Sequence, residues 1–128
     1  MKTIIIMGST SDEPHAKKIT DKLDEYGITW EQHAASAHKQ PLKVLEILEA
    51  NKNEKNIVYI TIAGRSNALS GFVAANSDFP TIGCPPFSDK SDMLVNIHST
   101  LQMPSQTPVL TVIDPGNCAL AVKRIFGV

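Results

Sequence analysis

Ile57-Val58-Tyr59-Ile60-Thr61-Ile62 is a continuous run of mostly β-branched side chains that stops at Gly64. A run of this kind is typical of a parallel strand that is covered on both faces. Ile4-Ile5-Ile6-Met7 repeats the pattern near the start of the chain and stops at Gly8. The two runs predict two inner strands of one parallel sheet.

Three further strands and five helices are predicted around these runs. The strands are residues 28–35, 81–84 and 109–112, and the longer inner strand extends over 56–63. The helices run from Asp12 to Gly27, from Pro41 through Leu48, from Asn67 to Asn76, from Asp89 or Ser91 through Leu101, and from Pro115 to Phe126. In the fourth helix, Leu94, Ile97 and Leu101 share one face. Strands that alternate with helices predict an α/β fold, a flavodoxin-like three-layer αβα sandwich with a five-stranded parallel sheet, formed by residues 1–128 as a single domain.

Composition excludes several classes of protein. The formal net charge is −1, so there is no global basic field that would recruit nucleic acid or an anionic membrane. No apolar run approaches the roughly 20 residues that cross a bilayer, and Met1–Met7 is too short for a signal-peptide core. Cys84 and Cys118 fit neither a disulfide framework nor a metal-ligand spacing. We therefore expect a cytoplasmic protein with buried, reduced thiols and no bound metal.

Small polar residues follow three of the strands, and they are the informative part of the sequence. The three loops are Gly8-Ser9-Thr10-Ser11-Asp12, Ser36-Ala37-His38-Lys39 and Gly64-Arg65-Ser66-Asn67. Because the carboxyl ends of parallel strands meet at one edge of a sheet, the loops are expected to line one pocket. The amides, hydroxyls and helix dipole of the first loop suit a phosphate. Asp12 suits either ribose hydroxyls or a plain N-cap.

His38 is the histidine whose position indicates chemistry. His15, His33 and His98 fall at helix or strand positions that are typical of surface or structural residues. An imidazole can take and return a proton near neutral pH, so His38 is a candidate general acid/base. Arg65 offers a planar fork for a carboxylate or a phosphate, whereas the local context of Lys39 fits a solvated charge or a phosphate partner.

These three loops resemble, in order and spacing, the signature loops of the aminoimidazole ribonucleotide carboxylase family. Cys84-Pro85-Pro86 and Leu101-Gln102-Met103-Pro104 resemble two later loops of that family. The family has a mutase branch, which usually has arginine after the histidine, and a branch that uses free carbon dioxide. Lys39 and Gly64-Arg65-Ser66-Asn67 are similar to the carbon dioxide-using branch, found in the animal bifunctional enzyme.

The resemblance implies a function in purine biosynthesis without a cofactor. The implied reaction is the reversible carboxylation of 5-aminoimidazole ribonucleotide with carbon dioxide, which is in equilibrium with bicarbonate, to 4-carboxy-5-aminoimidazole ribonucleotide. The implied site has His38 as general acid/base, Asp12 on the ribose, and Arg65 and Ser66 near the carboxylate or carbon dioxide. Ser9, Ser11, Ser36 and Lys39 are implied to contact the phosphate region, and the remaining implied binding residues are Gly8, Ala37, Gly64 and Asn67. It also implies a homo-oligomer, an octamer, with active sites near subunit contacts. The alternatives are the mutase and, more remotely, a non-catalytic phosphate- or flavin-binding domain of the same fold.

Overall fold

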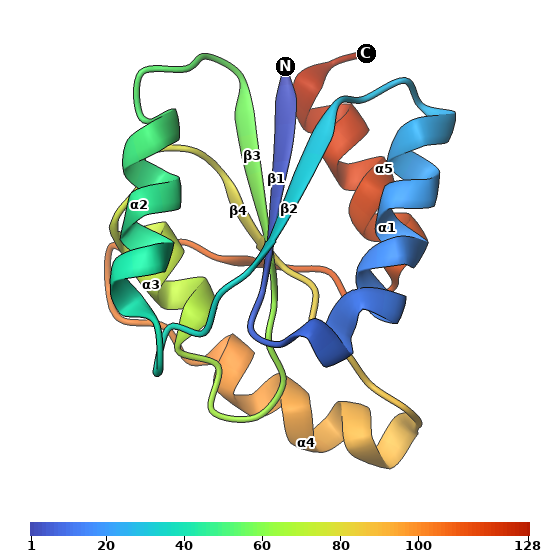
Figure 1. Cartoon of the computed structure of the whole chain (residues 1–128). Helices are drawn as coiled ribbons and strands as arrows, with labels where there is room; N and C mark the ends of the chain where they lie inside the picture. The colour runs from blue at the N-terminus through green and yellow to red at the C-terminus, as the bar shows by residue number, and fades with distance from the viewer.

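The computed structural model describes all of residues 1–128, and a parallel sheet of five strands runs through its centre (Figure 1). The strands are β1 (Lys2–Met7), β2 (Trp30–Ala34), β3 (Ile57–Ile62), β4 (Thr81–Gly83) and β5 (Leu110–Thr111). Their order across the sheet is β2-β1-β3-β4-β5, and every neighbouring pair is parallel. The flavodoxin-like α/β fold predicted from the sequence is thus confirmed.

The two apolar runs occupy the inner positions of this sheet. Every residue of β3 is buried, as is every residue of β1 after Lys2. β2 lies at the edge, and its residues are half-buried or exposed, which explains its weaker apolar pattern. β2 starts at Trp30, later than predicted, because the amide of Ile28 donates to the carbonyl of Leu23 and so belongs to the turn that ends the preceding helix.

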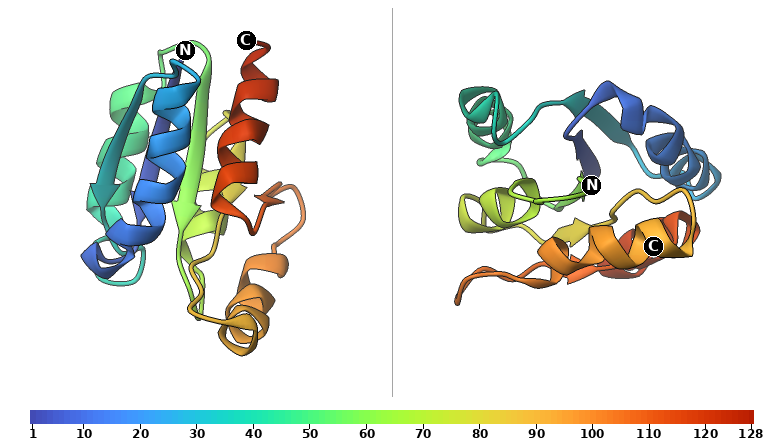
Figure 2. Two further views of the ribbon diagram at one scale, coloured as in Figure 1. Left: turned by 90° about the vertical axis from the view of Figure 1, so that its right-hand side faces the viewer. Right: turned by 90° about the horizontal axis from the view of Figure 1, so that it is seen from below.

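Four helices cover the two faces of the sheet (Figure 2). α1 (Glu13–Glu25) and α5 (Pro115–Phe126) pack together on one face, where Ile19, Leu23 and Val122 are fully buried. α2 (Pro41–Asn51) and α3 (Leu69–Ala75) cover the other face with a second apolar cluster. These two clusters, one on each side of the sheet, are the hydrophobic core.

Helix ends depart from the prediction at two places. Asp12 directly precedes α1, but its side chain makes no capping hydrogen bond, and a 3₁₀ turn η1 (Thr10–Asp12) comes before the helix. α3 begins at Leu69 rather than at Asn67, although the side chain of Asn67 accepts a hydrogen bond from the amide of Ser70. Gly27 ends α1 as predicted, with a φ of 69° that favours glycine.

α4 (Lys90–Leu101) lies across the carboxyl edge of the sheet rather than on a face (Figures 1 and 2). Asp89 caps it by accepting a hydrogen bond from the amide of Asp92 at 2.8 Å, one of the two caps predicted. The residues that α4 buries are polar, Asn96 and Thr100, whereas Leu94 and Leu101 are 60% and 59% exposed. Much of the apolar side of α4, including Leu94 and Leu101, is therefore exposed, and Ile97 is half-buried.

One expectation about the cysteines is confirmed by the fold. Cys84 and Cys118 are both buried and free. None of the helices combines the length and the apolar character that crossing a bilayer requires.

Candidate active site

The candidate site lies at the carboxyl ends of β1 and β3. This is the point in the sheet where the connections from neighbouring strands lead toward opposite edges. From β1 the chain moves outward to β2, and it then returns across the sheet to β3 on the other side of β1. The loops after β1 and β3 therefore diverge and leave a crevice, which is where open α/β sheets bind ligands. A hollow of about 190 Å³ lies here, lined by Gly8, Ser9, Asp12, Ser36, Ala37, His38, Ala63, Gly64, Arg65, Ser66, Ala68 and Leu69.

The loop after β1 presents hydroxyls and a carboxylate to the hollow. The amide of Gly8 donates to the carbonyl of Ile62 at 2.9 Å, which fixes the start of the loop against β3. The hydroxyl of Ser9 lies 2.9 Å from that of Ser11 and accepts a hydrogen bond from the Ser11 amide. Partial burial raises the pKa of Asp12 above the usual aspartate value, although His15 and the Ser9 backbone act in the opposite direction.

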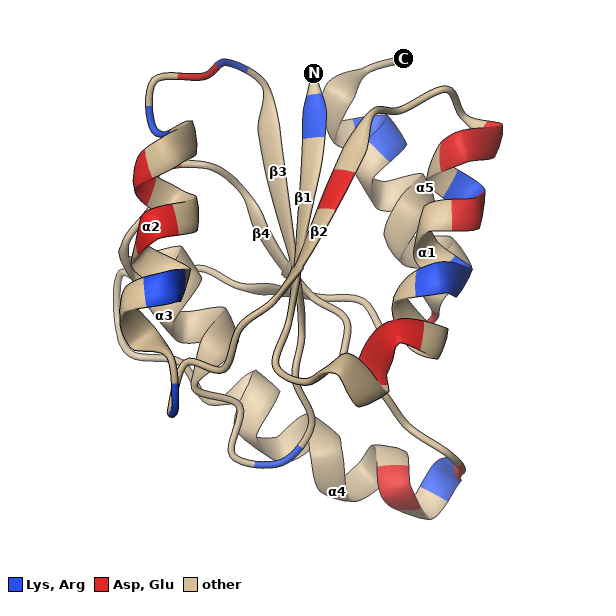
Figure 3. Ribbon diagram, viewed as in Figure 1, with Lys and Arg blue, Asp and Glu red and all other residues tan.

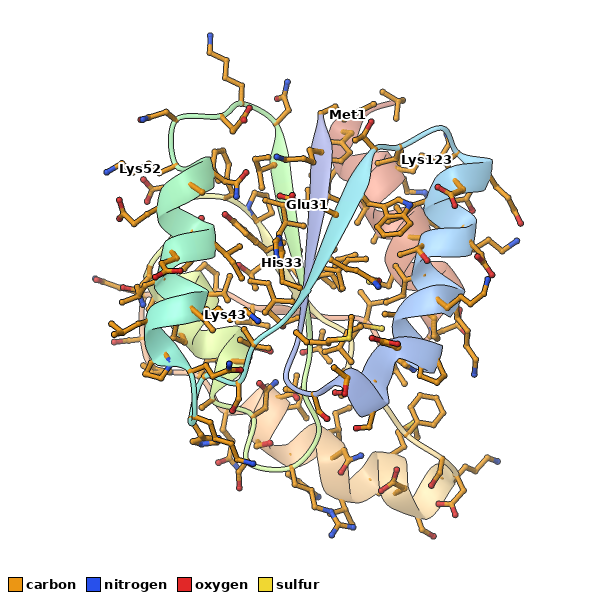
Figure 4. All side chains as sticks on the ribbon, in the orientation of Figure 1. Met1, Glu31, His33, Lys43, Lys52 and Lys123 are labelled. Carbon is orange, nitrogen blue, oxygen red and sulfur yellow. The ribbon has the colours of Figure 1, made fainter.

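The loop after β2 carries His38 in a turn at the edge of the hollow. The hydroxyl of Ser36 accepts a hydrogen bond from the Lys39 amide at 3.2 Å, and the Gln40 amide donates to the Ser36 carbonyl at 2.7 Å. Lys43 reaches from α2 toward β2, where its ammonium donates to the carbonyl of Ala34 at 2.6 Å (Figure 4). These bonds hold the turn, while the His38 ring remains exposed and free to meet a ligand.

The loop after β3 brings a cation to the same hollow (Figure 3). The side chain of Arg65 is 71% exposed, and its Nη2 lies 3.9 Å from Oδ1 of Asp92 on α4. Ser66 adopts a φ of 51°, a left-handed conformation that is uncommon for residues other than glycine. Backbone strain of this kind is concentrated at ligand-binding loops, and here it makes the sharp turn that exposes Arg65 and Ser66.

A buried polar network anchors this third loop. The side-chain amide of Asn67 donates to the hydroxyls of Ser70 at 2.7 Å and Thr100 at 2.9 Å, and its carbonyl oxygen accepts from the Ser70 amide. The hydroxyl of Ser99 accepts from the Asn67 amide at 2.9 Å. Through these bonds, α3 and α4 both hold the loop that carries Arg65.

The structure brings together most, but not all, of the residues that the sequence predicted for the site. His38 and eight of the predicted binding residues line the hollow, namely Gly8, Ser9, Asp12, Ser36, Ala37, Gly64, Arg65 and Ser66. Ser11 and Lys39 lie on the same loops but outside the lining, and Asn67 is directed into the protein. The sequence reasoning missed Ala63, Ala68 and Leu69, because alanine and leucine beside a strand end carry no chemical signal.

Comparisons with known proteins agree with this fold. Residues 2–128 match the model of the family described as AIR carboxylase. The chain is 50% identical over 126 residues to the phosphoribosylaminoimidazole carboxylase of Archaeoglobus fulgidus, covering 98% of this chain and 69% of that protein. It is 47% identical to the protein of the same name from Treponema denticola, over 96% of this chain and 77% of the other. A crystal structure of Treponema denticola PurE superposes with a TM-score of 0.91 at 43% identity, covering 98% of this chain and 80% of that one.

Proposed function

The chain belongs to the AIR carboxylase family and is an enzyme that acts as a carboxylase in purine biosynthesis, and from this premise we propose that His38 carries the proton in the reaction. The observation that supports this role is that His38 lies in one hollow with the carboxylate of Asp12 and the guanidinium of Arg65. The three side chains come from three different loops, and no other histidine lines that hollow. His38 is therefore the residue that we assign as general acid/base.

The proposed chemistry needs one base and no cofactor. The ring of aminoimidazole ribonucleotide is enamine-like, so its unsubstituted ring carbon attacks the carbon of carbon dioxide and forms the new carbon–carbon bond. That ring carbon then carries both a hydrogen and a carboxylate, and the ring has lost its aromaticity. His38 removes the hydrogen as a proton, and the electron pair of the broken bond restores the aromatic ring. In the reverse direction His38 returns the proton, and carbon dioxide leaves.

The lining of the hollow supports free carbon dioxide as the second substrate. Ala37, Ala63, Ala68 and Leu69 give the hollow a partly apolar wall. A small neutral molecule fits such a wall, because no polar group there must lose its water without gaining a partner. Arg65 also lines the hollow, and we assign it to pair with the carboxylate once that group has formed. Holding carbon dioxide next to the aminoimidazole ring in this way lowers the entropic cost of bringing the two reactants together.

A two-substrate assay tests the choice of carbon dioxide over a carboxylate that is already bound to the exocyclic nitrogen. We expect purified enzyme to turn over aminoimidazole ribonucleotide with bicarbonate, at a rate that rises when carbonic anhydrase speeds the supply of carbon dioxide. N-carboxyaminoimidazole ribonucleotide should be consumed only as fast as it decarboxylates spontaneously. Enzymatic turnover of the N-carboxy compound, with none of aminoimidazole ribonucleotide, would establish the mutase instead.

The nucleotide itself is proposed to lie across the first two loops. Ser9 and Ser36 line the hollow with hydroxyls, and Ser11 and Lys39 stand beside them on the same loops. We assign these four residues to the phosphate, and Asp12 to the ribose, because a carboxylate repels a phosphate but accepts hydrogen bonds from two hydroxyls.

Replacing Asp12 tests the ribose assignment. We expect Asp12→Ala to raise the KM for aminoimidazole ribonucleotide by about tenfold to a hundredfold, since each lost bond to a charged group contributes about 1.5–3 kcal/mol. Because burial raises the pKa of Asp12, nucleotide binding by the unaltered enzyme should weaken under mild acid, where protonation removes the negative charge of the carboxylate and turns one hydrogen-bond acceptor into a donor. Asp21→Ala, in an exposed i,i+4 ion pair with Lys17 on the same helix, is the matched control. Steady-state kinetics with an unchanged KM would remove Asp12 from the site.

We further propose that the enzyme is a cytoplasmic homo-oligomer, with residues 1–128 acting as one catalytic domain. The support for association is the outward face of α4, where Leu94, Val95 and Leu101 are 60%, 50% and 59% exposed. Exposed apolar side chains on one helix are typical of an interface between subunits. Because the opposite side of α4 holds the Arg65 loop, such an interface would lie next to the active site, as in the octamer that the family resemblance implies.

A further inference from the structure

Asp92 lies in the first turn of α4, and its carboxylate is held there by one of its two oxygens. Oδ2 accepts hydrogen bonds from the amide of Ser88 at 2.9 Å and from the hydroxyl of Ser88 at 3.3 Å. The amide of Asp92 in turn donates to the side chain of Asp89 at 2.8 Å. These bonds fix the carboxylate at the start of α4, and they leave Oδ1 free.

The free oxygen of Asp92 lies beside the guanidinium of Arg65. Oδ1 is 3.9 Å from Nη2, which is longer than the roughly 2.7–2.9 Å of a charge-assisted hydrogen bond. This ion pair is the only one that Arg65 makes, and the side chain of Asp92 is 28% exposed whereas that of Arg65 is 71% exposed. A fixed negative charge thus stands next to Arg65 without occupying any of its N–H donors.

Asp92 does not line the catalytic hollow, so any effect that it has there passes through Arg65. Arg65 lines that hollow together with His38 and Asp12. Asp92 instead lines a neighbouring hollow of about 340 Å³, which meets the first at Asp12. The proposed carboxylation gives Asp92 no task of its own.

An exposed arginine creates a competition in an enzyme that uses carbon dioxide. Bicarbonate, which is in equilibrium with carbon dioxide, is a planar anion whose oxygens match the fork of a guanidinium. Carbon dioxide is neutral and gains much less from that cation. An uncompensated Arg65 would therefore bind bicarbonate in the hollow and obstruct the substrate.

A neighbouring carboxylate reduces this competition. Two unit charges about 4 Å apart near solvent interact strongly enough to change the affinity for an anion about fivefold. The carboxylate of the product is less affected, because it is attached to a nucleotide that is already bound and so has a high effective concentration at Arg65. A partly neutralised Arg65 can still pair with the product, whereas free bicarbonate must bind by itself.

We propose that Asp92 is a positioning residue for Arg65 and that its charge keeps bicarbonate out of the catalytic hollow, which leaves the hollow to carbon dioxide. This rests on the role assigned to Arg65 in the proposed function. The ion pair between α4 and the third loop is then a determinant of specificity for the neutral substrate.

Inhibition by nitrate tests this role. Nitrate is planar and singly charged like bicarbonate, but it does not exchange with carbon dioxide, so its inhibition constant can be measured in carboxylation assays at constant ionic strength. We expect Asp92→Asn to lower that constant about fivefold. The KM for aminoimidazole ribonucleotide should change less than about twofold, because the nucleotide is assigned to the first two loops and Asp92 is away from them.

Asp89→Asn is the matched control. It removes a negative charge from the same end of α4, and asparagine caps a helix as well as aspartate does. The nitrate inhibition constant of Asp89→Asn should equal that of the unaltered enzyme. An unchanged constant in Asp92→Asn, or the same decrease in Asp89→Asn, would overturn the proposal.

Asp92→Glu separates the charge of Asp92 from its part in the helix cap. The longer side chain disturbs the bonds to Ser88 but keeps a negative charge near Arg65. We therefore expect Tm to fall while the nitrate inhibition constant stays close to that of the unaltered enzyme. A constant as low as that of Asp92→Asn would show that cap geometry, and not charge, is responsible, and the proposal would fail.

Arg65→Ala distinguishes an error in this proposal from an error in the role of Arg65. Nitrate should inhibit Arg65→Ala only weakly, and adding Asp92→Asn should not change that weak inhibition, since Asp92 acts through Arg65. If Arg65→Ala kept the rate and the nitrate inhibition of the unaltered enzyme, the role of Arg65 would be wrong, and that of Asp92 with it. If Arg65→Ala lost both while Asp92→Asn behaved like the unaltered enzyme, only the role of Asp92 would be wrong.

Discussion

His38→Asn is expected to lower kcat by about 10²–10⁴-fold, the range that a positioned general acid/base contributes. Asparagine keeps a polar side chain of similar reach, but it cannot take a proton from the ring carbon. Because His38 lies exposed in a turn with no hydrogen bond to the fold, its replacement should leave the structure intact. Nucleotide binding, measured by calorimetry, should stay within a few-fold of the unaltered enzyme.

The matched control for this experiment is His33→Asn. His33 belongs to β2, the strand that leads into the His38 loop, but its ring lies beside Glu31, with Nε2 3.8 Å from the carboxylate and outside the hollow (Figure 4). Activity of the His33 variant should remain within a factor of about two, as for most surface changes away from a site. If His38→Asn also kept a near-normal kcat, another group would have to move the proton.

The inner part of the fold could be predicted from the sequence because it depends on a simple physical requirement. β1 and β3 must be mostly apolar, since helices cover both of their faces. The position of the site follows from the same pattern, because parallel strands deliver their loops to one edge. The alternation of strands and helices is therefore enough to bring His38, Asp12 and Arg65 to one pocket, although the three residues are far apart in the chain.

The role of α4 could not be predicted in the same way. An apolar stripe such as Leu94, Ile97 and Leu101 is usually the buried face of a helix, but here Leu94 and Leu101 are exposed and Ile97 is half-buried, because α4 lies across the carboxyl edge of the sheet (Figure 1). The informative residues are the polar ones on the other side of α4. Asn96 and Thr100 are one helical turn apart, and hydroxyls and amides at this spacing are well suited to hold a backbone loop.

Asn67 shows where a sequence motif is ambiguous between two physical roles. It lies in the third signature loop, so a contact with substrate was expected by resemblance. In the fold its side chain is 9% exposed and is occupied by Ser70 and Thr100. The same sequence motif results whether Asn67 stabilises the loop or contacts the ligand. Only the folded structure shows the direction of its side chain, and so distinguishes the two roles.

Asn67→Ala therefore has a large expected effect on stability. The change would leave the hydroxyls of Ser70 and Thr100 and the Ser70 amide with fewer partners in a buried setting, where each unsatisfied group costs about 1–3 kcal/mol. We expect a loss of about 3 kcal/mol in the free energy of unfolding, or a fall of about 10 °C in Tm for a domain of this size. Asn76→Ala is the matched control, because Asn76 ends the same helix in an exposed position with a single side-chain bond, to the Phe72 carbonyl at 2.8 Å.

The same variant also decides what Asn67 does for catalysis. If it anchors the loop, kcat/KM at a temperature where the variant is fully folded should fall about tenfold, because Arg65 and Ser66 lose the tether that positions them. Thr100→Val, which removes one partner of Asn67 from the α4 side, should then lower both Tm and kcat/KM in the same direction. If Asn67→Ala instead weakened nucleotide binding while its Tm stayed equal to that of Asn76→Ala, the side chain would have to turn out of the protein and meet the substrate directly. A network that both α3 and α4 complete makes that rotation costly, since it would break three hydrogen bonds at once.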